Sequence, residues 1–451
     1  MGPTDPGMAL VWSKSRKAHP MKSIRPSTHY SSLALLMLAF SIYGCAAVSP
    51  SPDTHASVPD VVINGHSAHL LLDTGAEGTV IFNADKLGLK AAANTPAARG
   101  SANEPAVSEP VTIQLGPDEF KAQLMYRPFP WYLRAYLALS SDDMDGVLGW
   151  PELKSNILVL DPRNLSIKGV NELPANAVSW LKFHTVPRMN LWLEIPLADG
   201  KSGLLQVDTG NPYGVALSPS LWQSWLKSHP QATLVQRNQW GPDGSVASFA
   251  EAWADAIQIG PLTLTDVPIH AATKIELVGT PENYLGLLGL YALSRMDTVL
   301  DGKGGLAYFH PLDPPGPPYP GFPRPGDHTE SAPSAYPSRA WTTTDLHIDG
   351  RMLQANTLHY LGSKKLLEHD YAAVIADYTE VLRLVPQQIA ANLFRGVAKL
   401  NLADYPGALA DLQRFDNESK RPDPLLKSGF TKLKAGDYEG AKADYKRALG
   451  L

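Results

Sequence analysis

The chain has 451 residues, of which 44% are hydrophobic, and a formal net charge of −5 at pH 7. This length allows about three domains, and the hydrophobic content is sufficient to build their cores. The weakly acidic charge, without a basic stripe, argues against nucleic acid as a partner. A single cysteine excludes an internal disulfide bond.

The N-terminal residues 1–45 are typical of a targeting segment. An apolar run extends from Ser32 to Gly44, which is too short to span a bilayer comfortably and suits the hydrophobic part of a signal peptide. Met21 would give a more typical signal start than Met1. The basic region before the run consists of Lys14, Arg16, Lys17, Lys22 and Arg25.

The apolar run ends at Gly44-Cys45, an order that resembles the lipobox of bacterial lipoproteins. The resemblance implies a lipid anchor on Cys45 and a periplasm-facing place in the bacterial cell envelope. Ala46 stands where inner-membrane lipoproteins carry a retention Asp, which favours the outer membrane. The alternatives are an ordinary cleaved signal and an incidental or buried thiol. Residues 46–56 are predicted to be a flexible tether.

Residues 57–180 are predicted to form a first β-lobe. Its opening strand, Val58–Ile63, is followed by an Asn64-Gly65 hairpin signal and a returning apolar strand. The returning strand runs directly into Asp73-Thr74-Gly75.

The same motif returns at Asp208-Thr209-Gly210, so the two aspartates are 208 − 73 = 135 residues apart. Downstream anchors also match in the same order, which makes an internal repeat. The matched pairs are Ile113–Pro117 with Ile257–Pro261, Val147-Leu148-Gly149 with Leu287-Leu288-Gly289, and Asp161 with Asp301. Residues 181–312 are therefore predicted to be a second lobe.

Matching turns of duplicated domains can pair about a pseudo-two-fold axis, which would bring Asp73 and Asp208 together. Two facing carboxyl groups cannot both ionise cheaply, so they share a proton and titrate as a pair. Such a pair can act as base and acid at once on a bound water. The alternative is that each Asp-Thr-Gly is an ordinary turn tripeptide.

The paired motifs resemble those of aspartic peptidases of the pepsin and retropepsin kind, over residues 57–312. The resemblance implies a mainly β, two-lobed fold with its site where the two turns meet. The implied roles are water binding for Asp73 and Asp208, hydroxyl cross-links for Thr74 and Thr209, a tight backbone for Gly75 and Gly210, and packing beneath the turns for Leu148, Gly149, Leu288 and Gly289.

The residues after the two triplets differ from the pepsin pattern. Ala76 follows the first, as in retropepsins, and Asn211 follows the second, where Ser, Thr or Ala is usual. In pepsin-like enzymes a hydroxyl here donates to the catalytic carboxylate and favours its ionised form. Because Ala76 cannot donate this bond, we expect activity in mildly acidic to near-neutral conditions. Flap tips are predicted at Arg99–Ala102 and Trp240–Ser245.

Residues 120–144 hold an aromatic cluster, which we interpret as core packing, with a substrate-cleft lining as the alternative. Its members are Tyr126, Phe129, Trp131, Tyr132 and Tyr136. The proline-rich residues 313–340 are predicted to be an extended linker, with a ligand for a proline-reading module as the alternative. Residues 341–354 have no assignment.

Residues 355–451 are predicted to be helical and repetitive. Asp370-Tyr371, Asp404-Tyr405 and Asp437-Tyr438 recur at spacings of 34 and 33, which resembles the tetratricopeptide repeat. The resemblance implies an α-helical solenoid of three repeats whose groove binds a protein or peptide partner. The alternative is an unrelated helical bundle. Positions in register are Gly362, Gly396 and Gly429, then Val374, Ala408 and Ala441, then Tyr378, Leu412 and Tyr445.

The leading functional interpretation is an envelope-tethered aspartic endopeptidase. A water activated by Asp73 and Asp208 would hydrolyse polypeptide substrates without a metal or cofactor. His66 and His69 are interpreted as solvent-facing strand residues rather than metal ligands. The alternatives are a peptide-binding lipoprotein without turnover and an assembly scaffold based on the helical repeats.

Overall fold

The computed structural model describes residues 56–92, 106–126, 144–240, 246–313, 341–418 and 424–449. The signal segment, Cys45, the tether before residue 56, the first flap tip, residues 241–245 of the second and most of the proline-rich linker lie outside these ranges. Of the aromatic cluster, Tyr126 is described. Within the ranges given, no helix is long and apolar enough to cross a membrane.

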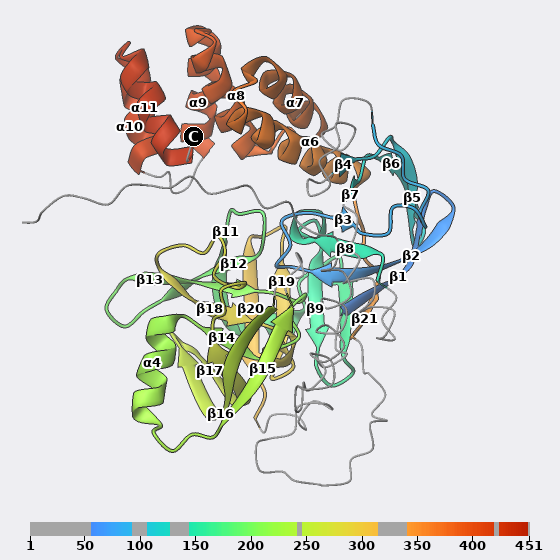
Figure 1. Cartoon of the computed structure of the whole chain (residues 1–451), viewed down its shortest axis with the longest axis vertical. Coiled ribbons are helices and arrows are strands. Elements are labelled where there is room, and N and C mark those ends of the chain that lie inside the picture. The colour runs from blue at the N-terminus through green and yellow to red at the C-terminus, as the bar shows by residue number, and fades with distance from the viewer. Residues whose placement is uncertain are drawn as a thin grey trace, which may run out of the picture. The chain divides into compact units, whose positions relative to one another are not determined.

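The described residues form a mainly β region followed by helices (Figure 1). The first lobe contains β1 (Ala56–Ile63), β2 (His66–Asp73), β3 (Val80–Ile81), β4 (Ala106–Val107), β5 (Val111–Leu115), β6 (Asp118–Ala122), β7 (Met125–Tyr126), β8 (Gly146–Gly149), α3 (Trp150–Leu153), β9 (Ile157–Asp161), β10 (Ser166–Val170) and the 3₁₀ turn η2 (Ala175–Ser179). The second lobe contains β11 (Leu181–Val186), β12 (Trp192–Pro196), β13 (Ser202–Val207), β14 (Val215–Leu217), α4 (Pro219–Ser228), β15 (Leu234–Trp240), β16 (Val246–Ile259), β17 (Leu262–Ala271), β18 (Tyr284–Leu288), α5 (Leu290–Leu293), β19 (Met296–Asp301) and β20 (Leu306–Pro311).

The hairpin of β1 and β2 positions the first aspartate. Its turn residues Asn64 and Gly65 both have positive φ, 54° and 81°, as a two-residue hairpin turn requires. β2 then buries alternate side chains, Ala68, Leu70 and Leu72, so that its last residue emerges at the edge of the core. The hairpin predicted from the sequence is confirmed.

β9 and β19 join the two lobes as antiparallel neighbours. In their register Val159 pairs with Val299, and each of these residues lies ten positions after the glycine that follows the apolar pair, Gly149 or Gly289. A residue that pairs with its own repeat equivalent marks a pseudo-two-fold axis. The repeat found in the sequence is therefore a repeat of structure as well.

A further strand, β21 (Trp341–Thr344), lies in the segment that the sequence left unassigned. It runs parallel to both β1 and β10. In the second lobe the matching position between β20 and β12 belongs to β11. A segment that follows the whole second lobe thus completes the sheet of the first. Its four residues are too short a pattern to identify as a strand beforehand.

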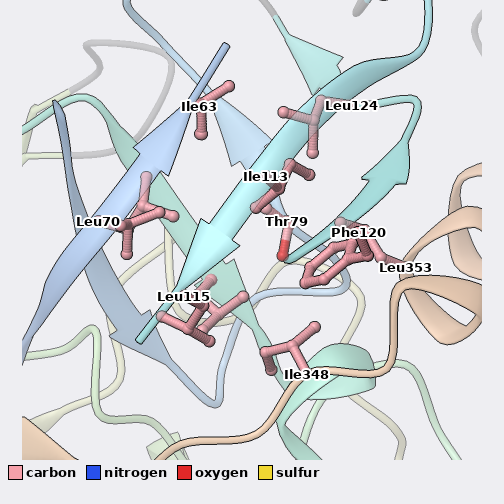
Figure 2. A pocket seen from close by; sticks show the side chains of 11 residues that line it. Ile63, Leu70, Thr79, Ile113, Leu115, Phe120, Leu124, Ile348 and Leu353 are labelled. Carbon is pink, nitrogen blue, oxygen red and sulfur yellow. The ribbon is translucent and has the colours of Figure 1, made fainter. Parts of the chain in front are cut away.

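Figure 2 shows how the segment after β21 closes an apolar pocket in the core of the first lobe. Ile348 and Leu353 point into it and are 3% and 4% exposed. The other side chains that line the pocket include Ile63, Leu70, Ile113, Leu115 and Phe120 on the strands and Leu124 between β6 and β7. Residues 341–353 are therefore part of the first lobe's core, far from it in sequence.

The C-terminal helices begin at Gly350, five residues before the predicted start. Asp349 caps the first one, since its side chain accepts a hydrogen bond from the backbone N–H of Arg351. Each helix packs on the next. They are α6 (Gly350–Leu367), α7 (Tyr371–Leu384), α8 (Ile389–Asn401), α9 (Tyr405–Glu418), α10 (Pro424–Lys434) and α11 (Tyr438–Leu449).

Contacts between these helices follow the period found in the sequence. A Cβ atom on Gly362, Gly396 or Gly429 would press against Tyr378, Leu412 or Tyr445, respectively. Ion pairs also repeat, as Lys365–Asp377, Lys399–Asp411 and Lys432–Asp444. The registered small and large positions thus let paired helices approach closely.

Candidate active site

Equivalent strand ends position the two aspartates. Asp73 is the last residue of β2 and pairs with Gly149 of the parallel strand β8. Asp208 follows β13, and its backbone N–H donates to the carbonyl of Leu288 on β18 at 3.0 Å. Leu148 and Leu288 are buried beneath the turns. A Cβ atom on Gly149 or Gly289 would collide with backbone atoms of the loop after each triplet, so these positions require glycine.

Thr74 and Thr209 bind the two turns to each other. The backbone N–H of each donates to the hydroxyl of the other, at 3.0 and 3.1 Å. The Thr74 hydroxyl donates to the carbonyl of Val207 at 2.8 Å, and the Thr209 hydroxyl to that of Leu72 at 2.7 Å. Both threonines are buried, so these four bonds fix the separation of the turns.

Each glycine of the motif lies against the opposite carboxyl group. A Cβ atom on Gly75 would overlap the carboxyl group of Asp208, and one on Gly210 would overlap that of Asp73. Both aspartates keep part of their surface accessible to solvent. The turns therefore place two carboxyl groups face to face and leave them reachable.

Backbone N–H groups hold one oxygen of each carboxyl group. Oδ1 of Asp73 accepts from Gly75 and Ala76, both at 2.9 Å. Oδ1 of Asp208 accepts from Gly210 at 2.9 Å and from Asn211 at 3.1 Å. These bonds orient the carboxyl groups and favour their ionised forms.

The two carboxyl groups hydrogen-bond each other and titrate together. Burial raises the pKa of Asp73, while its bonds with Asp208 and the two N–H groups partly offset that rise. Burial and then the negative charge of Asp73 raise the pKa of Asp208 well above its usual range. The two protons therefore leave in two steps that belong to the pair, and these effects favour Asp208 as the residue that keeps the second proton.

The side chain of Asn211 does not bind the adjacent carboxyl group. Its Nδ2 donates to Oε1 of Glu276 at 2.9 Å, and its Oδ1 accepts from the backbone N–H of Tyr213 at 2.9 Å. Glu276 in turn contacts Nε2 of His270 at 3.2 Å. Sequence reasoning missed Glu276 and His270, since the one signal was an Asn in place of a hydroxyl residue.

A different acid lies beneath the first turn. Thr79 donates from its hydroxyl to Oε2 of Glu152 at 2.9 Å and accepts the backbone N–H of Gly149 at 3.3 Å. Oε1 of Glu152 accepts from Nδ2 of Asn356 on α6 at 3.2 Å. The second lobe has Ala292 at the corresponding position, so this link to the helices belongs to the first lobe alone.

In the part of the chain that the structure covers, no three His, Cys, Asp or Glu side chains are grouped so that they could hold a metal ion. The chemistry that the site offers is a coupled pair of carboxyl groups, one of which holds a proton at a pH where the other has lost it.

No protein-family model and no curated protein matches the sequence. Among solved structures, the chain is similar to an aspartic proteinase from Irpex lacteus, with a TM-score of 0.34 and 13% identity over 57% of this chain and 97% of that one. It is also similar to conglutin gamma, a basic 7S globulin from lupine seeds, with a TM-score of 0.32 and 12% identity over 56% of this chain and 95% of that one. A likeness this distant carries no argument about chemistry, which has to come from the chain's own residues.

Proposed function

We propose that the protein is an aspartic-type endopeptidase. The observation that supports this most directly is the coupled pair of carboxyl groups, Asp73 and Asp208, held by cross-linked turns and accessible to solvent. A structural role alone does not require two carboxyl groups at close quarters, because such a pair costs stability when both ionise.

In the proposed reaction Asp73 is the base and Asp208 is the acid. A water between them bonds to the peptide carbonyl carbon while Asp73 takes its proton, and the carbonyl oxygen takes the proton of Asp208. The tetrahedral intermediate then collapses. The C–N bond breaks, the leaving nitrogen takes the proton held by Asp73, and Asp208 regains a proton from a hydroxyl of the intermediate.

The test is cleavage of a peptide library by the full-length protein. Asp73→Asn and Asp208→Asn should each lower kcat/KM by at least about a hundredfold, since proton transfer is lost. Mixing the two variants should not restore activity, because the cross-linked turns belong to one chain. No turnover by a folded wild-type protein would favour the non-catalytic peptide-binding alternative, and recovery on mixing would place the site between two chains.

We further propose that Cys45 carries a lipid anchor in the bacterial envelope. The order of basic segment, apolar run and Gly-Cys supports this. Lipoproteins of this kind carry several acyl chains, so attachment should be firm. Cys45→Ser should move the protein from the membrane fraction to the soluble one or block its processing. Unchanged fractionation would contradict the anchor.

The C-terminal helices are proposed to be tetratricopeptide repeats that bind a protein or peptide partner. The regular contacts at Gly362, Gly396 and Gly429 support this assignment. Removal of α7 to α11, residues 371–451, should leave cleavage of short peptides largely intact and reduce capture of the partner. Loss of short-peptide cleavage in a folded truncation would make the helices a catalytic support instead.

A further inference from the structure

The two halves of the dyad have different surroundings, and the difference centres on Glu276. This residue is 8% exposed, and it lies in the loop between β17 and β18. Its carboxyl group contacts three other parts of the second lobe, namely the loop after β13, β15 and β17, and also the backbone of its own loop. The contacts are Asn211 Nδ2 at 2.9 Å, Gln239 Nε2 at 3.3 Å, Thr273 N at 2.8 Å and His270 Nε2 at 3.2 Å.

Hydrogen bonds of their own fix the orientation of the two amide neighbours, Asn211 and Gln239. Oδ1 of Asn211 accepts from the backbone N–H of Tyr213, which leaves its Nδ2 as the group facing Glu276. Oε1 of Gln239 accepts from the hydroxyl of Thr273 at 2.7 Å, which does the same for Gln239. Glu276 thus meets donors from Asn211, Gln239 and the backbone of Thr273, an environment that suits a carboxylate.

This carboxylate acts on Asp208 in two ways. Through Asn211 it fixes the position of the turn that carries Asp208, although the backbone N–H groups of that turn by themselves favour the ionised form of Asp208. Its charge also adds to the effects that raise the pKa of Asp208. Asp73 has no such link through the residue after its triplet, since Ala76 stands there and Asn211 stands at the equivalent position of the second lobe.

Glu152, the acid beneath the first turn, does not supply Asp73 with a negative charge like that of Glu276. Burial raises the pKa of Glu152 to about 7, so it is neutral in mildly acidic solution. By contrast, the pKa of Glu276 falls to about 2, because the charge of His270 and the donors around it outweigh its burial. In the expected working range Glu276 therefore carries a buried negative charge beside the second turn, whereas Glu152 beneath the first turn carries none.

We infer that Glu276 is a positioning residue that keeps the shared proton of the dyad on Asp208 and leaves Asp73 as the base. The inference rests on the proposed peptidase function. Other titratable groups face Glu276 from the elements packed around it, and their titration also responds when the charge of Glu276 is removed. They are His270 on β17, Tyr284 on β18, Glu251 on β16 facing His270, and Arg237 on β15 paired with Glu251.

The experiment compares Glu276→Gln with Glu282→Gln in the full-length protein. Both remove one negative charge from the same loop, but Glu282 is exposed. The first readout is the titration of the Asp208 carboxyl group by its ¹³C signal, identified by loss in Asp208→Asn. The second is the pKa of the basic limb in the pH profile of kcat/KM, which belongs to the free enzyme.

Glu276→Gln should lower both the pKa of Asp208 and the pKa of the basic limb by about one pH unit, as expected for removal of a nearby charge. Glu282→Gln should leave both where the wild type has them. If Glu276→Gln does not fold, the double variant Glu276→Gln/His270→Gln takes its place, since it replaces both members of the buried pair by amides. We expect it to lower the pKa of Asp208 by less than the single variant would. A structural role alone would lower stability without moving the titration.

A titration of Asp208 that coincides in the wild type, Glu276→Gln and Glu282→Gln overturns the inference, even if the wild type cleaves peptides. A wild type that cleaves no peptide refutes the proposed function instead. The carboxyl titration needs no turnover, so it still decides whether Glu276 controls the proton on Asp208.

Discussion

Thr74 and Thr209 hold each other across the two lobes, since the backbone N–H of each donates to the hydroxyl of the other. Their side chains are 0% and 1% exposed, so no water replaces a bond that is lost. These hydrogen bonds directly connect the two turns that carry Asp73 and Asp208.

Removal of one hydroxyl should therefore damage both stability and activity. Thr74→Ala leaves the carbonyl of Val207 and the N–H of Thr209 without their buried partner. We expect a loss of about 2 to 4 kcal/mol of unfolding free energy. Thr74→Ser keeps the hydroxyl and should lose less. Thermal unfolding and kcat/KM of the two variants measure this, and equal stability of Thr74→Ala and wild type would contradict it.

The pH profile of activity should be a bell in mildly acidic to near-neutral conditions. The active pair has one proton, so its acidic limb follows the raised pKa of Asp73 and its basic limb the further raised pKa of Asp208. Ala76→Ser adds a donor near Asp73, which lowers that pKa and should move the acidic limb to lower pH. A wild-type maximum in strong acid, or a profile unmoved by Ala76→Ser, would contradict the local argument.

β21 should be indispensable to the first lobe. Trp341 is 0% exposed and lies in the main core, so Trp341→Ala should cost on the order of 3 to 5 kcal/mol. Thr342→Ala on the exposed side of the same strand should change stability by about 0.5 kcal/mol or less. Chemical denaturation compares the two. Similar losses would mean that the strand is not packed as described.

Stability should also fall as the pH rises, because of Glu152. Burial raises the pKa of this residue from its ordinary 4.5 to about 7. The folded state then binds the proton more tightly than the unfolded chain, so stability is full below about 4.5 and is lost progressively up to about 7. The loss should be on the order of 3 kcal/mol.

The measurement is the unfolding free energy at several pH values, together with hydrogen exchange of α6, whose Asn356 binds Glu152. Glu152→Gln should remove this part of the pH dependence. Glu172→Gln, a change at an exposed glutamate, should not. A Glu152→Gln variant that keeps the wild-type dependence would show that another group is responsible.

The sequence by itself determined the motifs and their repetition. Asp73-Thr74-Gly75 and Asp208-Thr209-Gly210 follow apolar strands, and the downstream glycines match, so two equivalent turns could be expected to meet. The Asn64-Gly65 hairpin and the helical period were equally readable. These features are local, because short stretches of consecutive residues determine turn geometry and periodic spacing.

The tertiary structure alone decided what surrounds those turns. Glu276 reaches Asn211 from 65 residues away, and Asn356 reaches Glu152 from 204 residues away. β21, which begins at Trp341, pairs with β1 and β10, and both of these strands precede it by a whole lobe. No local pattern marks such contacts, because they depend on which side chains the completed core brings within hydrogen-bond distance, and a buried polar group takes whatever partner the fold supplies.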